Sequence, residues 1–582
     1  MVHHHRTSPR WVIAGTLLAV GPGLGCANHT TGVVGTGRDA GSAGADGGRG
    51  VYVLGEMSEL PPPPPRPTSA ARLRAPLSHT FVSQGYPRLQ WFLPDDAQGA
   101  QVEVCRDRAC TMLEQRLEAP GSELTLSERL EAGVHFWRVR ARRGGALDAQ
   151  TSATWEFVSP PRDAPRLWSG GNFADINGDG YLDYVASVDG NVMVAVYGTS
   201  TGIAEARVER HRSQHLGSAG PVMVNAAPVG DVNGDGFSDV LVGNVEDDEA
   251  DARHHPAQYE LYLGSDSGLH ASTARFRGRT FNTPHFGISV VGDINDDGFQ
   301  DVFVADNELV YAADRQFNPN VTESYILFGG PEGFNPRHAQ RIPRPSGAAR
   351  TYGGRATTIP DINGDGRQEI VLLDTTILGS GEHRFSLWLS PHALPFSAAE
   401  RSFTWSGRGN AVMDLDLSLC DVDGDGRGDV VFPEGALTRE ESVGIGYFPA
   451  SHLLQDPLVP SVRSDVPGAY GGDFVNLGGL DVQCLASYWM DGLEPVVHIG
   501  RDIMAAALDA SGEFVWRRVY GSDRNFLFGD YCPRLHAGNF GLFAGIVAAI
   551  PGDRIAVRDS RFQMASEFST SPSRSLWLLS CR

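Results

Sequence analysis

The sequence predicts an all-β protein, most of it built from a repeated unit, and three observations lead to this. A nine-residue acidic cassette occurs five times between residues 175 and 429, with starts 56 to 68 residues apart. Apolar and polar residues alternate on both sides of the cassettes, which is the period of a β-strand. Spacings of this size are typical of solenoids, propellers and other repeat arrays. The 582 residues allow two to four domains.

Each cassette carries oxygen-bearing side chains at fixed positions. The five read DINGDGYLD at 175–183, DVNGDGFSD at 231–239, DINDDGFQD at 293–301, DINGDGRQE at 361–369 and DVDGDGRGD at 421–429. Calcium takes six to eight hard oxygen ligands, which Asp and Asn at positions 1, 3 and 5 and the acid at position 9 can supply. Glycine at position 6 permits a sharp turn with positive φ. Surface Asp-Gly turns are the alternative, but five copies with one spacing favour about five Ca²⁺ sites.

The cassettes differ from helical calcium sites of the EF-hand type. An EF-hand loop needs Glu at position 12 and a helix on each side. Position 12 is apolar in every copy, and the flanks alternate with period two, as at Val302 and Val304. The cassettes are therefore expected to join β-strands. The apolar residues at position 12 are Ala186, Val242, Val304, Leu372 and Phe432.

A second pattern accompanies the cassettes. Strand-like runs end in glycine at Gly198, Gly264 and Gly329, and aromatic–glycine pairs such as Phe286-Gly287 precede some cassettes. Together these features resemble the FG-GAP repeats of the integrin α-subunit propeller over about 163–582. In that family each repeat forms one four-stranded blade. The 420 residues of this region then correspond to seven blades of 60 residues, although six or eight blades and the way the ring closes stay open. The last two blades have lost the acidic pattern.

The resemblance implies a ligand set for each loop, with position 7 binding through its backbone carbonyl. The implied ligands are Asp175, Asn177, Asp179, Tyr181, Asp183, Asp231, Asn233, Asp235, Phe237, Asp239, Asp293, Asn295, Asp297, Phe299, Asp301, Asp361, Asn363, Asp365, Arg367, Glu369, Asp421, Asp423, Asp425, Arg427 and Asp429.

The amino end has the pattern of an export signal. Arg6 and Arg10 precede a short apolar run and a small-residue stretch ending at Cys26, so residues 1–25 are expected to be a cleaved signal peptide. The sequence before Cys26 resembles a bacterial lipobox, which implies a lipidated cysteine. Ordinary cleavage, with Cys26 as a bystander, is the alternative. Residues 26–74 are rich in Gly and Pro and are expected to form a tether.

Residues 75–161 have the alternation and turn spacing of a small β-sandwich. The segment from Gly133 to Ala141 resembles the late strand of a fibronectin type III domain, and another Ig-like sandwich is the alternative. The seven cysteines leave six once Cys26 is lipidated. Cys105 and Cys110 are close enough to bridge a hairpin. The remaining disulfide candidates, whose pairing is open, are Cys420, Cys484, Cys532 and Cys581.

Composition and motifs argue against two classes of function, nucleic-acid binding and common types of catalysis. A net charge of −22 argues against nucleic-acid binding, and no sequence motif of a common catalytic site is present. Arg427-Gly428-Asp429 spells an adhesion tripeptide, but Asp429 is an expected ligand. We expect a noncatalytic binding or adhesion protein, exported and held at a bacterial outer membrane or cell surface by its lipid alone. Its partner would be an extracellular protein or glycan. A polysaccharide-active enzyme and a structural envelope protein are the alternatives.

Overall fold

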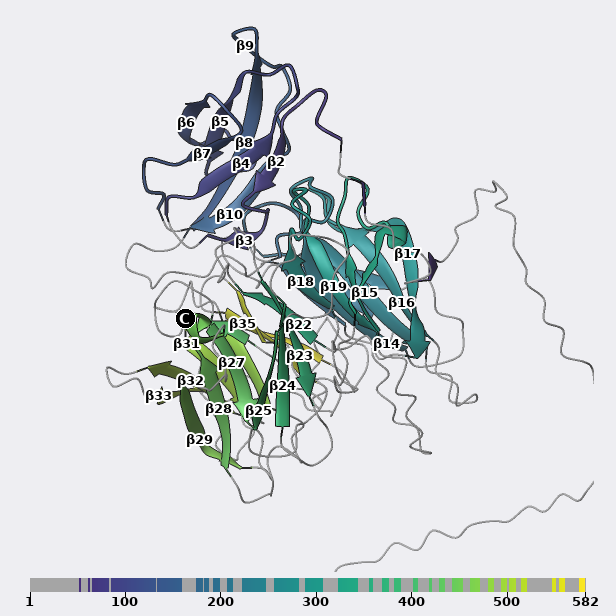
Figure 1. Cartoon of the computed structure of the whole chain (residues 1–582), viewed down its shortest axis with the longest axis vertical. Helices are drawn as coiled ribbons and strands as arrows, with labels where there is room; N and C mark the ends of the chain where they lie inside the picture. Colours follow the sequence, from purple (N-terminus) through teal and green to yellow (C-terminus); the bar gives the residue numbers. More distant parts are fainter. Residues whose placement is uncertain are drawn as a thin grey trace, which may run out of the picture. The chain divides into compact units, whose positions relative to one another are not determined.

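The structure, a computed structural model, describes the chain in segments. These are residues 52–53, 61–62, 65–82, 85–131, 133–159, 174–181, 183–187, 192–198, 207–212, 222–246, 256–281, 288–306, 323–343, 355–359, 369–375, 382–388, 401–406, 418–420, 429–434, 442–453, 461–470, 480–485, 494–499, 502–508, 514–520, 547–550, 554–559 and 575–580. Every regular element in these segments is a β-strand, apart from the short 3-10 helices η1 (Pro336–His338) and η2 (Ala450–His452) (Figure 1). The expected all-β class is confirmed for this part of the chain.

Residues 71–159, called here the N-terminal unit, form two sheets around a shared core. The smaller sheet has the order β2-β4-β7, and the larger has the order β3-β10-β8-β5-β6 with β9 beside β8. Leu89 and Trp91 of the smaller sheet pack with Val102, Trp137 and Phe157 of the larger one. The strands are β2 (Arg72–Ala75), β3 (Thr80–Phe81), β4 (Arg88–Phe92), β5 (Gly99–Cys105), β6 (Leu113–Ala119), β7 (Glu123–Thr125), β8 (Gly133–Arg143), β9 (Ala146–Leu147) and β10 (Trp155–Ser159).

The N-terminal unit begins earlier than the sequence boundary at residue 75. Ala71 and Leu73 are buried in its core, and β2 pairs with β4, so 71–74 belong to the unit and not to the tether. The sequence pattern does not show this edge strand, because four residues next to a proline-rich stretch are too few to show a period. Tyr52–Val53 (β1), also in the expected tether, pairs parallel to β17.

Downstream of residue 183, seven antiparallel sheets of consecutive strands follow one another in the described residues. The first and last have three strands, and the second has β1 added to its four. The strands are β11 (Tyr184–Ser187), β12 (Val192–Val196), β13 (Val208–Arg212); β14 (Val222–Gly230), β15 (Asp239–Glu246), β16 (Pro256–Leu263), β17 (His270–Phe281); β18 (Ile288–Gly292), β19 (Asp301–Asp306), β20 (Glu323–Leu327), β21 (Gln340–Arg341); β22 (Arg355–Ile359), β23 (Glu369–Thr375), β24 (Glu382–Trp388), β25 (Arg401–Ser406); β26 (Ser418–Cys420), β27 (Asp429–Glu434), β28 (Ser442–Phe448), β29 (Val462–Tyr470); β30 (Leu480–Leu485), β31 (Glu494–Ile499), β32 (Asp502–Leu508), β33 (Phe514–Tyr520); and β34 (Val547–Ile550), β35 (Arg554–Asp559), β36 (Ser575–Ser580).

The first four of these sheets pack face to face in chain order. Side chains alternate along β15, so Val240 and Val242 face the β11–β13 sheet while Leu241 faces the β18–β21 sheet. Phe303 of β19 in turn packs with Ile370 of β23. Because each middle strand is covered on both faces, its residues are nearly continuously apolar, as expected for a strand without a solvent face.

Four of the acidic cassettes lie between the first and second strands of a sheet, and the first cassette lies just before β11. In the second and third sheets a β-bulge precedes the loop, at Gly230 and Gly292. Both glycines have positive φ, 72° and 77°, which few other residues tolerate. The bulge ends the pairing and turns the chain into the loop.

Several expectations fall outside the described residues. These are the signal peptide, Cys26, most of the tether, loop residues 361–368 and 421–428, Cys532 and Cys581. Cys420 and Cys484 lie in β26 and β30. No helix in the described segments has the length and hydropathy needed to cross a membrane.

Candidate metal site

The three described acidic loops, 175–183 (apart from Leu182), 231–239 and 293–301, share the same backbone turn. Glycine at position 6 has positive φ in all three, 86° at Gly180, 93° at Gly236 and 86° at Gly298. Position 4 is also left-handed and is occupied by Gly178, Gly234 and Asp296. The glycine at position 6 therefore has the role expected of it, and Asp296 takes a conformation that Asp tolerates better than most residues.

The aspartate at position 1 organises each loop by accepting hydrogen bonds from its backbone. Asp231 accepts from the N–H groups of Gly234 (2.7 Å), Asp235 (3.1 Å) and Gly236 (2.7 Å). Asp175 and Asp293 accept from the residues at positions 5 and 6 of their own loops. The turn thus holds the first carboxylate toward the inside of the loop.

The side chains at positions 3 and 5 contact each other. Asn295 Nδ2 donates to Asp297 Oδ2 (2.9 Å), and the same bond joins Asn233 to Asp235 (2.8 Å) and Asn177 to Asp179 (3.0 Å). In each loop the side-chain nitrogen of the Asn at position 3 is therefore already used in a hydrogen bond. Asn295 Oδ1 is buried and has no hydrogen-bond partner, so the third loop holds a buried oxygen acceptor that no donor satisfies.

The aspartate at position 9 joins the loop to the strands around it. Asp239 Oδ2 accepts from Val232 N (2.9 Å), and its Oδ1 accepts from Gly264 N (2.9 Å), just after β16. Asp183 makes the equivalent pair of bonds to Ile176 and Gly198. The glycines that end the strand-like runs in the sequence therefore lie beside the acidic loops.

Successive loops are also hydrogen-bonded to one another. Ser238 N donates to the carbonyl oxygen of Asp175 (3.0 Å), and Gln300 N makes a longer contact to that of Asp231 (3.4 Å). Gly330 N, which follows the third sheet's β20, donates to Val232 O (2.9 Å). The three loops form a connected chain, so ordering one restrains the next.

The loop carboxylates are crowded and desolvated. Burial, together with the neighbouring acids, raises the pKa of Asp293 from 3.8 to about 7 and that of Asp175 to about 6. The pKa values of Asp183, Asp239 and Asp301 are raised well above the ordinary value for the same reasons. Buried like charges are costly unless a proton or a cation neutralises them.

The donor set fits a hard cation. Each described loop offers three Asp carboxylates, one Asn oxygen and a backbone carbonyl at position 7, all of them oxygen. In the described part of the chain, however, no group of three or more His, Cys, Asp or Glu side chains is placed so that it could hold a metal ion. For loops four and five the structure describes only Glu369, which is buried, and the backbone of Asp429.

Three arginines of the N-terminal unit, Arg72, Arg74 and Arg108, contact the loops, which the sequence did not predict, and two of them donate to loop backbone oxygens. Arg108 donates to the carbonyl oxygens of Gly178 (2.9 Å) and Gly236. Arg72 donates to the carbonyl oxygen of Asp297. Their guanidinium groups also lie over the position 7 rings, Arg108 4.1 Å from the Phe237 centroid and Arg72 4.9 Å from that of Phe299. The position 7 side chains therefore have a packing role besides the expected backbone one.

A buried carboxyl of the N-terminal unit lies at the first loop. Glu156 is fully buried, with Oε1 3.2 Å from Nε2 of His79, which is also buried. Burial and the nearby Asp175 raise the pKa of Glu156 well above 4.5, and burial lowers that of His79 well below 6.5. The sequence did not predict this pair, because a Glu or a His within a strand pattern looks like any other polar residue.

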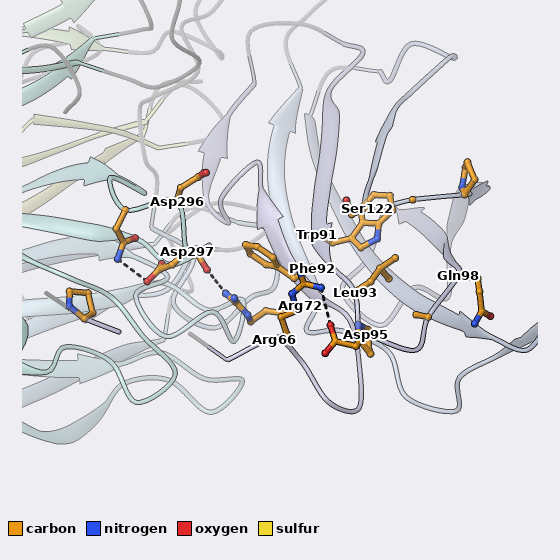
Figure 2. Close-up of a pocket in the computed structure, with 16 residues that line it drawn as sticks. Arg66, Arg72, Trp91, Phe92, Leu93, Asp95, Gln98, Ser122, Asp296 and Asp297 are labelled. Carbon is orange, nitrogen blue, oxygen red and sulfur yellow. Dashed lines mark hydrogen bonds and ion pairs between the residues drawn. The ribbon is translucent and has the colours of Figure 1, made fainter. Parts of the chain in front are cut away.

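A cavity of about 930 Å³ lies where the N-terminal unit meets the third loop. Figure 2 shows Arg72 between Phe92 and Asp297, and the guanidinium of Arg72 is 4.4 Å from the Phe92 centroid. On the same wall Arg66 Nη1 forms an ion pair with Asp95 (2.8 Å), both of them largely exposed.

Comparison with known proteins gives no family. No protein-family model matches the chain, and no curated protein matches it. Among solved structures, one that matches is the crystal structure of the exotype rhamnogalacturonan lyase YesX, at 14% identity and a TM-score of 0.31. The match covers 85% of this chain and 72% of the lyase chain.

Proposed function

We propose that this chain is a surface-anchored, noncatalytic binding protein whose repeat region is a calcium-stabilised, seven-bladed propeller. The observation that carries the proposal is the common geometry of the three described acidic loops. Asp at positions 1 and 9, Asn at position 3 and a left-handed glycine at position 6 recur in each, and the position 9 carboxylate is buried in all three. Calcium bound there would neutralise the crowded acids and hold the loops in shape.

The sheet order supports the proposed architecture. Seven consecutive sheets match the number expected from 60 residues per blade, and the face-to-face packing of the first four is the packing that neighbouring blades require. The strand orders β2-β4-β7 and β10-β8-β5-β6 support a fibronectin type III-like sandwich for the N-terminal unit.

In the proposed site, each ion is held by the side chains at positions 1, 3, 5 and 9 and by the position 7 carbonyl. In the third loop these are Asp293, Asn295, Asp297, Asp301 and Phe299. The role of the ion is structural, because the same residues tie each loop to the strands of its sheet. The partner is proposed to be an extracellular protein or glycan, with Cys26 as the lipid anchor.

Two measurements on the full chain test this proposal. Isothermal titration calorimetry is expected to show several calcium ions bound per chain, and the melting temperature is expected to rise between EDTA and millimolar calcium. A chain that binds no calcium and melts identically in both buffers would contradict the calcium sites. Pull-downs with glycan and protein libraries, with and without calcium, then test the binding role. Depolymerisation of an offered polysaccharide would favour an enzyme instead.

A further inference from the structure

The N-terminal unit touches all three described acidic loops, and most of these contacts go to their backbone oxygens. Arg108 lies in the turn between β5 and β6. Its Nε donates to Gly178 O (2.9 Å), Nη2 to Gly236 O, and Nη1 to Thr154 O of its own unit (3.0 Å). One guanidinium therefore joins the first loop, the second loop and the N-terminal unit.

Further contacts extend the interface. Trp155 Nε1 donates to Gly234 O (3.1 Å) in the second loop. In the third loop, Arg72 donates to Asp297 O, and Arg74 forms an ion pair with Asp296. The contacted positions are 4, 5 and 6 of the cassettes, which form the turn itself.

These contacts require the loops in their folded shape. Gly178 and Gly236 present their carbonyl oxygens to Arg108 from left-handed backbone, with φ of 67° and 93°. The same turn directs the carboxylates of Asp175 and Asp231 inward through the bonds from backbone N–H groups. The arginine therefore binds the conformation that also assembles the oxygen ligands.

The approach is close enough to exclude side chains at the turn. A Cβ on Gly178 would overlap the Arg108 guanidinium, and one on Gly236 would overlap Thr154 O. A Cβ on Gly180 would come within 3.2 Å of the Phe136 ring. The glycines of the cassette thus permit the left-handed turn and also leave room for the N-terminal unit to pack against it.

Arg108 is held in place by its own hairpin. It lies inside the loop closed by the disulfide between Cys105 and Cys110. Asp107 accepts from the backbone N–H groups of Thr111 (3.1 Å) and Met112 (2.6 Å), which fixes the same turn. A preorganised guanidinium loses less conformational freedom when it forms its bonds.

We propose that the N-terminal unit is a clamp on the acidic loops, so that cation binding and docking of the unit stabilise each other. This inference rests on the proposed calcium sites. A cation that orders the loops strengthens docking, and by thermodynamic linkage docking increases cation affinity by the same factor. Arg108 acts as a positioning residue, because its bonds go to carbonyl oxygens and not to the carboxylates.

The positive charge of Arg108 acts against calcium binding, because a guanidinium near the loops repels the calcium ion. The two effects are separated by comparing Arg108→Gln with Arg108→Lys. Lysine keeps the charge but cannot reproduce the forked set of bonds. If positioning dominates, both variants bind calcium more weakly. If charge dominates, Arg108→Lys behaves as the unmodified chain does and Arg108→Gln binds more tightly.

The test is calcium titration calorimetry on the full chain and these two variants. Arg142→Gln is the matched control, because Arg142 lies in the same unit but pairs with Glu118. We expect about a tenfold loss of affinity in both Arg108 variants and none in Arg142→Gln. Unchanged or tighter binding in Arg108→Gln would overturn the clamp.

Hydrogen exchange supplies a readout that separates the clamp from the calcium sites. In calcium, Arg108→Gln is expected to raise amide exchange in 104–112 and 174–183, while Arg142→Gln is not. If the unmodified chain binds no calcium, the proposed function fails. In that case the same exchange comparison is made in calcium-free buffer to test whether Arg108 holds the N-terminal unit on the loops. Equal amide protection in the unmodified chain and both variants would overturn the clamp as well.

Discussion

Asp301 accepts a hydrogen bond from the backbone N–H of Gly329, 28 residues further along the chain (3.0 Å). This bond ties the end of the third acidic loop to the end of β20, the second strand after it. The equivalent bond recurs in the two preceding sheets. It explains why a glycine follows each of these strands, since the backbone passes close to the loop there.

Gly329→Ala is expected to destabilise the chain by about 1–3 kcal/mol through overpacking. The added Cβ would lie 2.5 Å from Gln300 O and 2.7 Å from Val232 O, which are backbone atoms with little freedom to move. Chemical denaturation measures the change. Gly121→Ala is the control, because a Cβ there meets nothing within 4 Å. Equal midpoints for the two variants would contradict the close approach.

The metal-free chain is expected to lose stability as the pH rises from about 5 to 8. The folded-state pKa values of Asp175 and Asp293, about 6 and about 7, lie above the ordinary 3.8. Between these values the folded chain binds more protons than the unfolded chain, so its stability falls with rising pH. Melting temperatures in EDTA at pH 5.5 and pH 8 measure this difference.

Calcium is the control for the pH experiment. A bound cation keeps the carboxylates ionised and competes with protons, so in millimolar calcium the fall between pH 5.5 and pH 8 should disappear or reverse. An identical pH dependence in calcium and EDTA would show that groups other than the loop acids are responsible.

Removing the disulfide by Cys105→Ser with Cys110→Ser is expected to cost about 2 kcal/mol, the chain-entropy value for so short a loop. The two cysteines are five residues apart. Urea unfolding followed by tryptophan fluorescence reports this, because Trp91, Trp137 and Trp155 all lie in the N-terminal unit's core. An unchanged urea midpoint would mean that the hydrogen bonds of Asp107 hold the turn without the bridge.

Cys26→Ser is expected to release the chain from membranes. The reason is that the proposed lipid on Cys26 is the expected anchor, and serine cannot carry it. Detergent phase partitioning of the expressed protein, with incorporation of labelled fatty acid as a second readout, measures the effect. Identical partition of Cys26→Ser and the unmodified chain, with no label incorporated into either, would count against lipidation of Cys26.

Local features of the molecule could be predicted from the sequence. The all-β class followed from period-two alternation, and the loop turns followed from glycines at fixed positions in nine contiguous residues. The Cys105–Cys110 bridge followed from a short separation. In each case the residues that interact are close in the chain, so the pattern is visible without knowledge of the fold.

Contacts between distant segments were decided only by the tertiary structure. Arg108 is 70 residues from Gly178 and 128 from Gly236, and nothing in the spacing of a lone arginine marks it as a loop contact. The link from Ser238 to Asp175, and the membership of Leu73 in the first core, depend likewise on how separate strands pack. The residues of each acidic loop are contiguous, so the sequence alone predicts the loop. The residues that contact the loops come from distant segments, and such long-range packing leaves no periodic pattern in the sequence.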